Sequence, residues 1–135
     1  MPLTILASAQ LVAQLTALGL RVEYLTNPIG IDVVQPRLSW RIASTRRNTT
    51  QAAYQLRVAT SEASLTRGVN LLWDSGRVMS DTSVFVNYRG PPAVSRTRYY
   101  WRVRVWDNSG RESPWSAIGF GNPDYCNPRT GRPGG

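Results

Sequence analysis

Residues 98–107 read Arg-Tyr-Tyr-Trp-Arg-Val-Arg-Val-Trp-Asp and alternate between two kinds of side chain. One face of this stretch is apolar and consists of Tyr99, Trp101, Val103 and Val105. The opposite face is basic and aromatic and consists of Arg98, Tyr100, Arg102, Arg104 and Trp106. A period of two predicts a half-buried antiparallel strand. The rest of the chain must therefore supply a partner for the apolar face.

Six other segments carry strand signals and are bounded by turn residues. We expect these strands at residues 20–24, 37–42, 53–59, 71–73, 83–88 and 115–120. In the fifth of them we expect Val84, Val86 and Tyr88 to share one face. One helical turn is expected at residues 61–65, with Ser61 as its cap. Seven short strands without a strong amphipathic helix predict an all-β sandwich with antiparallel strands.

The length of 135 residues fits one domain with tails. We expect an N-terminal extension over residues 1–19, the sandwich over 20–120, and a disordered or foreign tail over 121–135, where alternation is lost. Residues 3–20 are uncharged and suit a helical turn or two, but they are too polar and too short for a membrane span. The N-terminus has no basic residue, although Ala7-Ser8-Ala9 looks like a cleavage site. The compartment stays open, with a cytoplasmic location slightly favoured over secretion.

The charge of +8 comes entirely from arginine, with 16 Arg and no Lys. Such a charge raises affinity for phosphate backbones, but the arginines are scattered and form no basic run, so we do not expect nucleic-acid binding. Cys126 is the single cysteine and the chain has no histidine. These counts exclude an intrachain disulfide, zinc sites and histidine-based triads. We expect no cofactor and no metal.

The expected sandwich resembles two known kinds of domain. Trp40, Tyr54 and the stretch from Tyr99 to Val105 resemble a fibronectin type III or immunoglobulin-like domain. Four ordered motifs resemble the N-terminal domain of bacterial-type α-L-rhamnosidases, and together they cover about residues 20 to 120. They are Leu-Thr-Asn-Pro-Ile-Gly-Ile-Asp at 25–32, Pro-Arg-Leu-Ser-Trp at 36–40, Leu-Trp-Asp-Ser-Gly at 72–76 and Tyr-Tyr-Trp-Arg-Val-Arg-Val-Trp-Asp at 99–107.

This resemblance implies an accessory role and not a complete enzyme. In the family, a jelly-roll-like domain and an (α/α)-barrel catalytic domain lie downstream, and these domains are the expected partners. The chain ends before such domains, so we expect a truncated gene product, a fragment or an altered reading frame, without catalytic residues. The expected structural core is Trp40, Tyr54, Tyr99 and Trp101. The resemblance also places Tyr99 at a corner where its hydroxyl bonds to nearby backbone.

The acidic residues give little support for autonomous glycoside hydrolysis, which needs two carboxyl groups about 5–10 Å apart. Asp32, Asp74, Asp81 and Asp107 all fall at predicted strand ends or turns. Carboxylates at such positions commonly accept backbone hydrogen bonds. We therefore expect these four acids to stabilise turns.

The basic and aromatic face of residues 98–107 is the candidate binding site, with Tyr100, Arg102, Arg104 and Trp106 as its residues. Sugars stack on aromatic rings and bond to guanidinium groups, so this face suits rhamnose-containing glycans. Alternatively, the arginines lie over the rings and cover the sheet, or the face docks onto a neighbouring domain. Our main hypothesis is an accessory rhamnosidase domain, and the alternative is a stand-alone carbohydrate- or protein-binding module.

Overall fold

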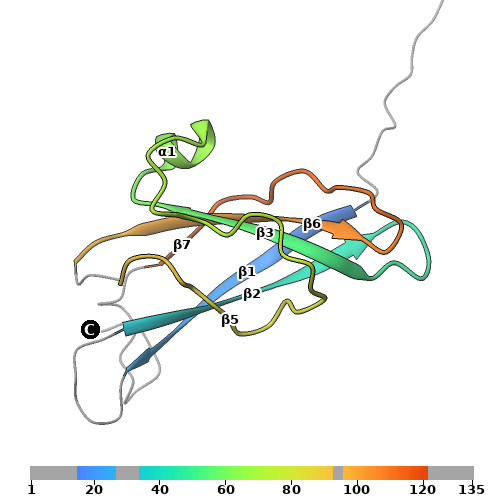
Figure 1. Cartoon of the computed structure of the whole chain (residues 1–135), viewed down its shortest axis with the longest axis horizontal. Coiled ribbons are helices and arrows are strands. Elements are labelled where there is room, and N and C mark those ends of the chain that lie inside the picture. Colours follow the sequence, from blue (N-terminus) through green and yellow to red (C-terminus); the bar gives the residue numbers. More distant parts are fainter. Residues whose placement is uncertain (1–14, 27–33, 93–95, 122–135) are drawn as a thin grey trace, which may run out of the picture.

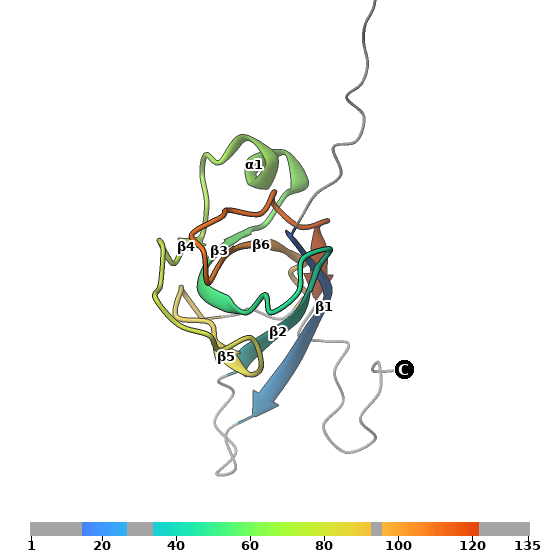
Figure 2. The same ribbon diagram turned by 90° about the vertical axis from the view of Figure 1, so that its right-hand side faces the viewer.

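Two antiparallel sheets face each other across an apolar core (Figure 2). The structure is a computed structural model that describes residues 15–26, 34–92 and 96–121. Its strands are β1 (Leu15–Thr26), β2 (Val34–Ser44), β3 (Gln51–Ala59), β4 (Trp73–Asp74), β5 (Val86–Asn87), β6 (Tyr99–Asp107) and β7 (Gly119–Gly121). One helix, α1 (Glu62–Arg67), follows β3. None of the helical segments in these residues is long and apolar enough to cross a membrane.

The sheet order confirms the predicted sandwich. A three-stranded sheet runs β1-β2-β5 and a four-stranded sheet runs β4-β3-β6-β7 (Figure 1). Every pairing is antiparallel, and β3 pairs with β6 along almost its whole length. Because β5 returns to β2 after β3 and β4 have joined the other sheet, the chain crosses between the two layers. The alternating stretch at residues 98–107 contains β6, an inner strand of the four-stranded sheet.

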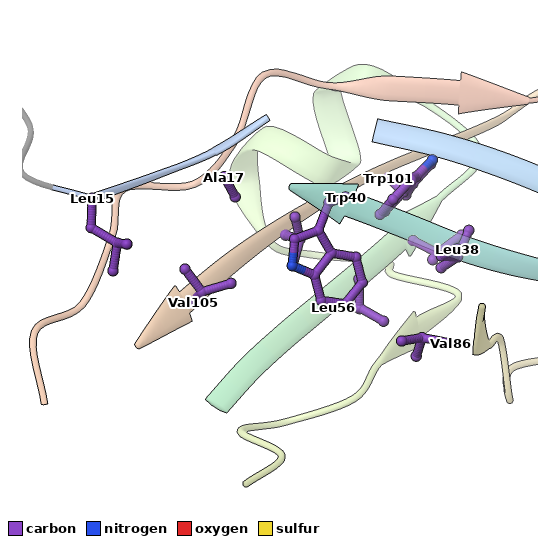
Figure 3. Close-up of a cluster of buried hydrophobic side chains, with 10 residues drawn as sticks. Leu15, Ala17, Leu38, Trp40, Leu56, Val86, Trp101 and Val105 are labelled. Carbon is purple, nitrogen blue, oxygen red and sulfur yellow. The ribbon is translucent and has the colours of Figure 1, made fainter. Parts of the chain in front are cut away.

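The core lies between the sheets and takes residues from both of them. Figure 3 shows Trp40 of β2 beside Leu56 and Trp101, which come from the opposite sheet. The indole ring of Trp40 stacks edge-on against Tyr54, at 5.3 Å between ring centroids, and against Trp101, at 6.5 Å. Its Nε1 donates to Gln51 Oε1 at 2.9 Å, so the buried N–H has a partner. Trp40 and Trp101 are each 2% exposed, whereas Tyr54 and Tyr99 are partly buried against the same cluster.

Strand β1 begins earlier than expected, at Leu15, so residues 15–19 belong to the sandwich and not to an N-terminal extension or helical turn. Leu15 and Ala17 point into the core, and the alternation then changes phase before Val22. The cause is a β-bulge between Leu18 and Arg21, where β1 has one residue more than β2. Gly19 has a φ of +66° at this bulge. A simple period-two pattern cannot cross such a point, so residues 15–18 carried no recognisable strand signal.

Replacing Gly19 with alanine is expected to lower the free energy of unfolding by about 1 kcal/mol, because an L residue is strained at positive φ. The alanine Cβ would also lie 2.8 Å from Arg41 Nε, and this side chain must move away. Urea unfolding followed by tryptophan fluorescence measures the loss. Gly19→Asn is the control and should lose less, because asparagine tolerates this region. Equal losses for the two variants would contradict a backbone origin.

Two predicted strands in the middle of the chain are shorter in the structure than expected. β4 contains Trp73 and Asp74 instead of residues 71–73, and β5 contains Val86 and Asn87 instead of residues 83–88. The prediction that Val84 shares a face with Val86 was wrong, because Val84 is 54% exposed and Val86 is 7% exposed. Phe85 between them has a φ of +56°, which interrupts the extended backbone. Alternation of residue types therefore did not translate into alternation of side-chain direction.

The predicted last strand, residues 115–120, begins only at Gly119. Before it, the segment 112–117 runs beside β6 with an irregular backbone that contains Pro114. Two serine hydroxyls replace backbone carbonyls as acceptors: Val105 N donates to Ser113 Oγ at 2.9 Å and Val103 N donates to Ser116 Oγ at 3.1 Å. In return, the backbone N–H groups of these serines donate to the β6 carbonyls, each at 2.8 Å. This arrangement leaves the Trp115 side chain on the outer face of the four-stranded sheet.

Helix α1 lies on the same outer face, away from the three-stranded sheet (Figures 1 and 2). The expected cap is confirmed, because Ser61 Oγ accepts from Ser64 N at 3.0 Å. At the other end Gly68 adopts the left-handed conformation and closes the helix. Leu65 is fully buried between the helix and the sheet. The outer face of the four-stranded sheet is therefore partly covered before its arginines are considered.

Candidate functional site

The four candidate residues lie along β6 on the outer face of the four-stranded sheet, but they do not form one open surface. Trp106 is only 6% exposed, whereas Tyr100, Arg102 and Arg104 are half-buried. The guanidinium carbon of Arg77 lies 4.4 Å from the Trp106 ring centroid, and that of Arg104 lies 5.4 Å away. Trp106 is thus covered by arginines.

Trp115 is the centre of this face, and sequence reasoning assigned it no site role. The guanidinium carbons of three arginines lie close to its ring centroid: Arg57 at 4.9 Å, Arg102 at 4.9 Å and Arg104 at 4.6 Å. Contacts of this kind are attractive because a cation meets the negative face of the ring. Together, Trp106, Trp115 and the four arginines at 57, 77, 102 and 104 form a layer that we call the arginine–tryptophan cover.

Each arginine beside Trp115 also has a hydrogen-bond partner. Arg57 Nε donates to Asp74 Oδ2 at 3.0 Å. Arg104 donates to Glu112 Oε2 at 2.8 Å and to Gln55 Oε1 at 3.1 Å. Arg102 has a different kind of partner, because its Nη2 donates to the Leu65 carbonyl of α1 at 3.0 Å. These bonds hold the guanidinium groups in place and occupy some of the donors that a sugar would need.

Arg57 and Arg102 stand directly opposite each other in the β3–β6 register. Like charges in this position repel, so the pair needs compensation. Asp74 supplies a counter-charge for Arg57, and the Trp115 ring and a helix carbonyl supply partners for Arg102. Burial first, and then the charges of Arg57 and Arg104, lower the pKa of Arg102 from its ordinary value. The surroundings of Arg102 thus disfavour its charged form.

Tyr100 stands apart from the cover, at the other end of β6. Its ring centroid is 6.4 Å from that of Phe120 of β7, with an angle of 47° between the rings. The guanidinium carbon of Arg98 lies 5.2 Å from the Phe120 ring centroid. Phe120 is 62% exposed, which makes this second cluster far more open than the cover.

Two carboxylates stabilise turns, as their positions suggested. Asp107 is 3% exposed, and its Oδ1 accepts from Ser109 N, Ser109 Oγ and Arg111 N, each at 2.9 Å. Asp74 Oδ1 accepts from Gln55 Nε2 and Gly76 N, both at 2.9 Å. Asp81 is exposed, and Asp32 lies outside the described residues. No group of three or more potential metal ligands comes together in the part of the chain that the structure describes.

The pKa values of both turn carboxylates are lowered. Burial alone would raise the pKa of Asp107, but hydrogen bonds from the Arg111 and Ser109 backbone and the Ser109 hydroxyl, with the charge of Arg111, outweigh it. At Asp74, burial is likewise outweighed by hydrogen bonds from Gln55, Gly76 and Arg57 and by the charge of Arg57. Both groups favour the ionised form in the folded protein.

Stability is therefore expected to fall in acid. A carboxylate whose folded pKa lies below its unfolded value, about 3.9, stabilises the fold fully above that value, and the contribution is lost as pH falls through the folded pKa. Urea unfolding at pH 7 and at several values below pH 4 tests this. Asp107→Asn keeps an oxygen acceptor and removes the titration, so its stability should fall less steeply in acid. A variant as acid-sensitive as the wild type would contradict the assignment.

The sandwich and its sheet order define the chain as an immunoglobulin-like domain. Residues 17–121 match the family model of the Rha78A-like N-terminal immunoglobulin domain, and the chain belongs to this family.

The relatives are long proteins that share this domain. An α-L-rhamnosidase from Streptomyces avermitilis is 54% identical over 96 residues, which are 71% of this chain and 9% of that protein. The crystal structure of Streptomyces avermitilis α-L-rhamnosidase with L-rhamnose superposes with a TM-score of 0.67 at 49% identity, over 78% of this chain and 10% of that one. The rhamnosidase structure from Dictyoglumus thermophilum gives 0.68 at 33% identity, over 78% and 12%. This chain thus spans about a tenth of the length of the relatives that it matches.

Proposed function

We propose that this chain is a non-catalytic accessory domain, or a fragment, of an α-L-rhamnosidase, which packs on and positions the domains that hydrolyse terminal α-L-rhamnosides. The observation that carries the proposal is the match of residues 17–121 to an N-terminal domain family, in relatives named α-L-rhamnosidase of which the match covers about a tenth. Most of such a protein therefore lies in other domains, among them the jelly-roll-like and catalytic domains expected as partners.

The environment of the carboxylates supports a non-catalytic role. A glycosidase needs a general acid with a raised pKa and a second carboxylate at a fixed distance. Asp74 and Asp107 have lowered pKa values and are bound by turn backbone and side chains. Glu23 pairs with Arg37, at 3.3 Å, and Glu112 pairs with Arg104, at 2.8 Å. These four acids are engaged in holding the fold.

The arginine–tryptophan cover supports a structural role for most of the candidate face. Stacking of a sugar requires an open ring face. Trp106 is almost closed to solvent, and the guanidinium groups of Arg57, Arg102 and Arg104 lie around Trp115. We propose that Arg102, Arg104 and Trp106 stabilise the sheet surface and that Tyr100 belongs to a different contact.

An activity assay tests the proposal. The isolated chain should release no aryl alcohol from an aryl α-L-rhamnoside above the buffer rate. Rhamnose-containing oligosaccharides should also leave its tryptophan fluorescence unchanged, with Trp106→Ala and Tyr100→Ala as controls. Turnover that disappears when an acid is replaced by its amide would contradict the accessory role. A saturable fluorescence change lost in Tyr100→Ala would favour the alternative, a carbohydrate-binding module.

A further inference from the structure

We propose that strand β7 and the end of the sandwich beside it form the docking surface for the polypeptide that follows this domain in an α-L-rhamnosidase. Phe120, Tyr100 and Arg98 make the side-chain contacts on this surface. The inference rests on the proposed function and names the surface through which that function is exerted. The occupant is the start of the next domain, presenting an apolar side chain to Phe120 and a carboxylate to Arg98.

The Phe120 side chain is exposed to solvent. Its ring is 62% exposed although Tyr100 lies on one side, at 6.4 Å between ring centroids, and the Arg98 guanidinium carbon lies 5.2 Å away. Single exposed apolar residues are common on soluble proteins. A pre-arranged pair of aromatic rings with an arginine at its edge is different, because tyrosine, phenylalanine and arginine are the residues enriched at protein interfaces.

The cluster of Phe120, Tyr100 and Arg98 lies near the end of the segment that matches the family. The family match ends at residue 121, one residue after Phe120, and the relatives are about ten times longer than the match. Polypeptide that continues from residue 121 in such a protein therefore begins beside Phe120. A contact there costs little additional ordering, because the partner is already tethered at the surface.

The inner side of β7 also borders a cavity. Gly121 lines a small pocket together with residues from both sheets, among them Tyr88, Tyr99 and Trp101. Its volume of about 20 Å³ admits a methyl-sized group or one carbonyl oxygen, but not a ring. Among residues 15–26, 34–92 and 96–121, no group accepts a hydrogen bond from the buried Tyr88 Oη or Trp101 Nε1. Trp101 Nε1 lies beside Gly119 of β7, 3.2 Å from where a Cβ on that glycine would stand. Buried donors without acceptors are costly, so a backbone carbonyl of the following polypeptide at this point would accept from Trp101 Nε1.

A matched pair on the other sheet provides the control. Phe85 is 51% exposed, and the Arg37 guanidinium carbon lies 4.2 Å from its ring centroid. The pair of Phe85 and Arg37 therefore has the same residue types as the pair of Phe120 and Arg98, and the two phenylalanines are similarly exposed. Phe85 precedes β5 of the three-stranded sheet, far along the chain from residue 121. The proposal assigns docking to Phe120 and not to Phe85.

The test introduces a thiol at one position or the other. Phe120→Cys and Phe85→Cys are made in the full chain, and also in a chimera in which residues 17–121 replace the matched segment of the Streptomyces avermitilis rhamnosidase. Maleimide labelling is mapped by peptide mass spectrometry, which separates the new thiol from Cys126. The thiol at position 120 should react at least about ten-fold more slowly in the chimera than in the isolated chain. The thiol at position 85 should react equally fast in both.

Hydrogen exchange of the same two proteins separates the possible failures. Protection of the domain in the chimera at segments other than 119–121, with unchanged labelling at position 120, would overturn this docking surface and leave the proposed function standing. An absence of protection at every segment of the domain would contradict the proposed function itself. If the chimera lacks rhamnosidase activity, the thiol is placed in the Streptomyces avermitilis enzyme at the position aligned with Phe120, and the same ten-fold criterion applies.

Discussion

Replacing Trp40 with alanine is expected to lower the free energy of unfolding by about 3–5 kcal/mol. Trp40 is 2% exposed and stacks on Tyr54 and Trp101, so its removal opens a cavity between the two sheets. It also removes the donor to Gln51 Oε1. Small domains are stable by only about 5–15 kcal/mol in total, so the variant should be largely unfolded in mild urea. The measurement is the urea midpoint, followed by circular dichroism.

Two controls separate the parts of this effect. Trp40→Phe keeps a ring in the core and removes the indole N–H, and it should lose about 1–3 kcal/mol, as expected for a buried acceptor left unpaired. Met79→Ala changes a side chain that is 69% exposed and should stay within about 0.5 kcal/mol of the wild type. If Trp40→Ala were no less stable than Trp40→Phe, the ring would not be what joins the sheets.

Replacing Trp115 with alanine is expected to lower the free energy of unfolding by about 1.5–3 kcal/mol, because an exposed cation–π contact contributes about 0.5–1 kcal/mol and three arginines meet this ring. The variant also leaves Arg57 and Arg102 facing each other without the ring. Its deficit should therefore shrink as salt screens the repulsion between the arginines. Urea unfolding at low and high salt measures both effects.

The variants Arg104→Ala and Trp115→Ala, alone and combined, give the coupling free energy between the Arg104 guanidinium and the Trp115 ring. A double-mutant cycle should give about 0.5–1 kcal/mol, which is the usual contribution of a single cation–π contact. Trp115→Phe retains a ring with a weaker negative face and should recover part of the stability. A loss below about 0.5 kcal/mol for Trp115→Ala would mean that the cover is a consequence of the fold and not one of its supports.

Strand β6 was predictable because apolar residues alternate with basic or aromatic residues along it. Trp101, Val103 and Val105 are at most 2% exposed, as the alternation requires. The family could be inferred from the ordered motifs for a similar reason, since each of them is a local feature of the sequence. Patterns that are continuous along the chain can be followed without knowing which strand pairs with which.

Cover of the sheet by arginines was one of the alternatives for this face, but the members of the cover could not be predicted, because they come from distant segments. The pairing of Arg57 with Arg102 is a matter of register, and register is invisible in either strand alone. Trp115 was placed in a regular strand, whereas serine hydroxyls hold its segment in another shape. Pro114 was the available signal, because proline interrupts the hydrogen bonds of a strand. Trp106 was assigned correctly to the outer face, but its burial depends on Arg77 in a separate loop.

Ser113 and Ser116 cover part of the edge of β6. Within the part of the chain that the structure describes, β7 pairs with β6 only at Tyr99, Tyr100 and Trp101, so the apolar residues further along β6 would present an open strand edge. Open edges recruit strands of other molecules and start aggregation. Ser113 and Ser116 engage the backbone at Val103 and Val105, while the proline between them keeps their own segment from becoming a new template. The segment that carries Trp115 therefore also keeps the edge of β6 from pairing with strands of other molecules.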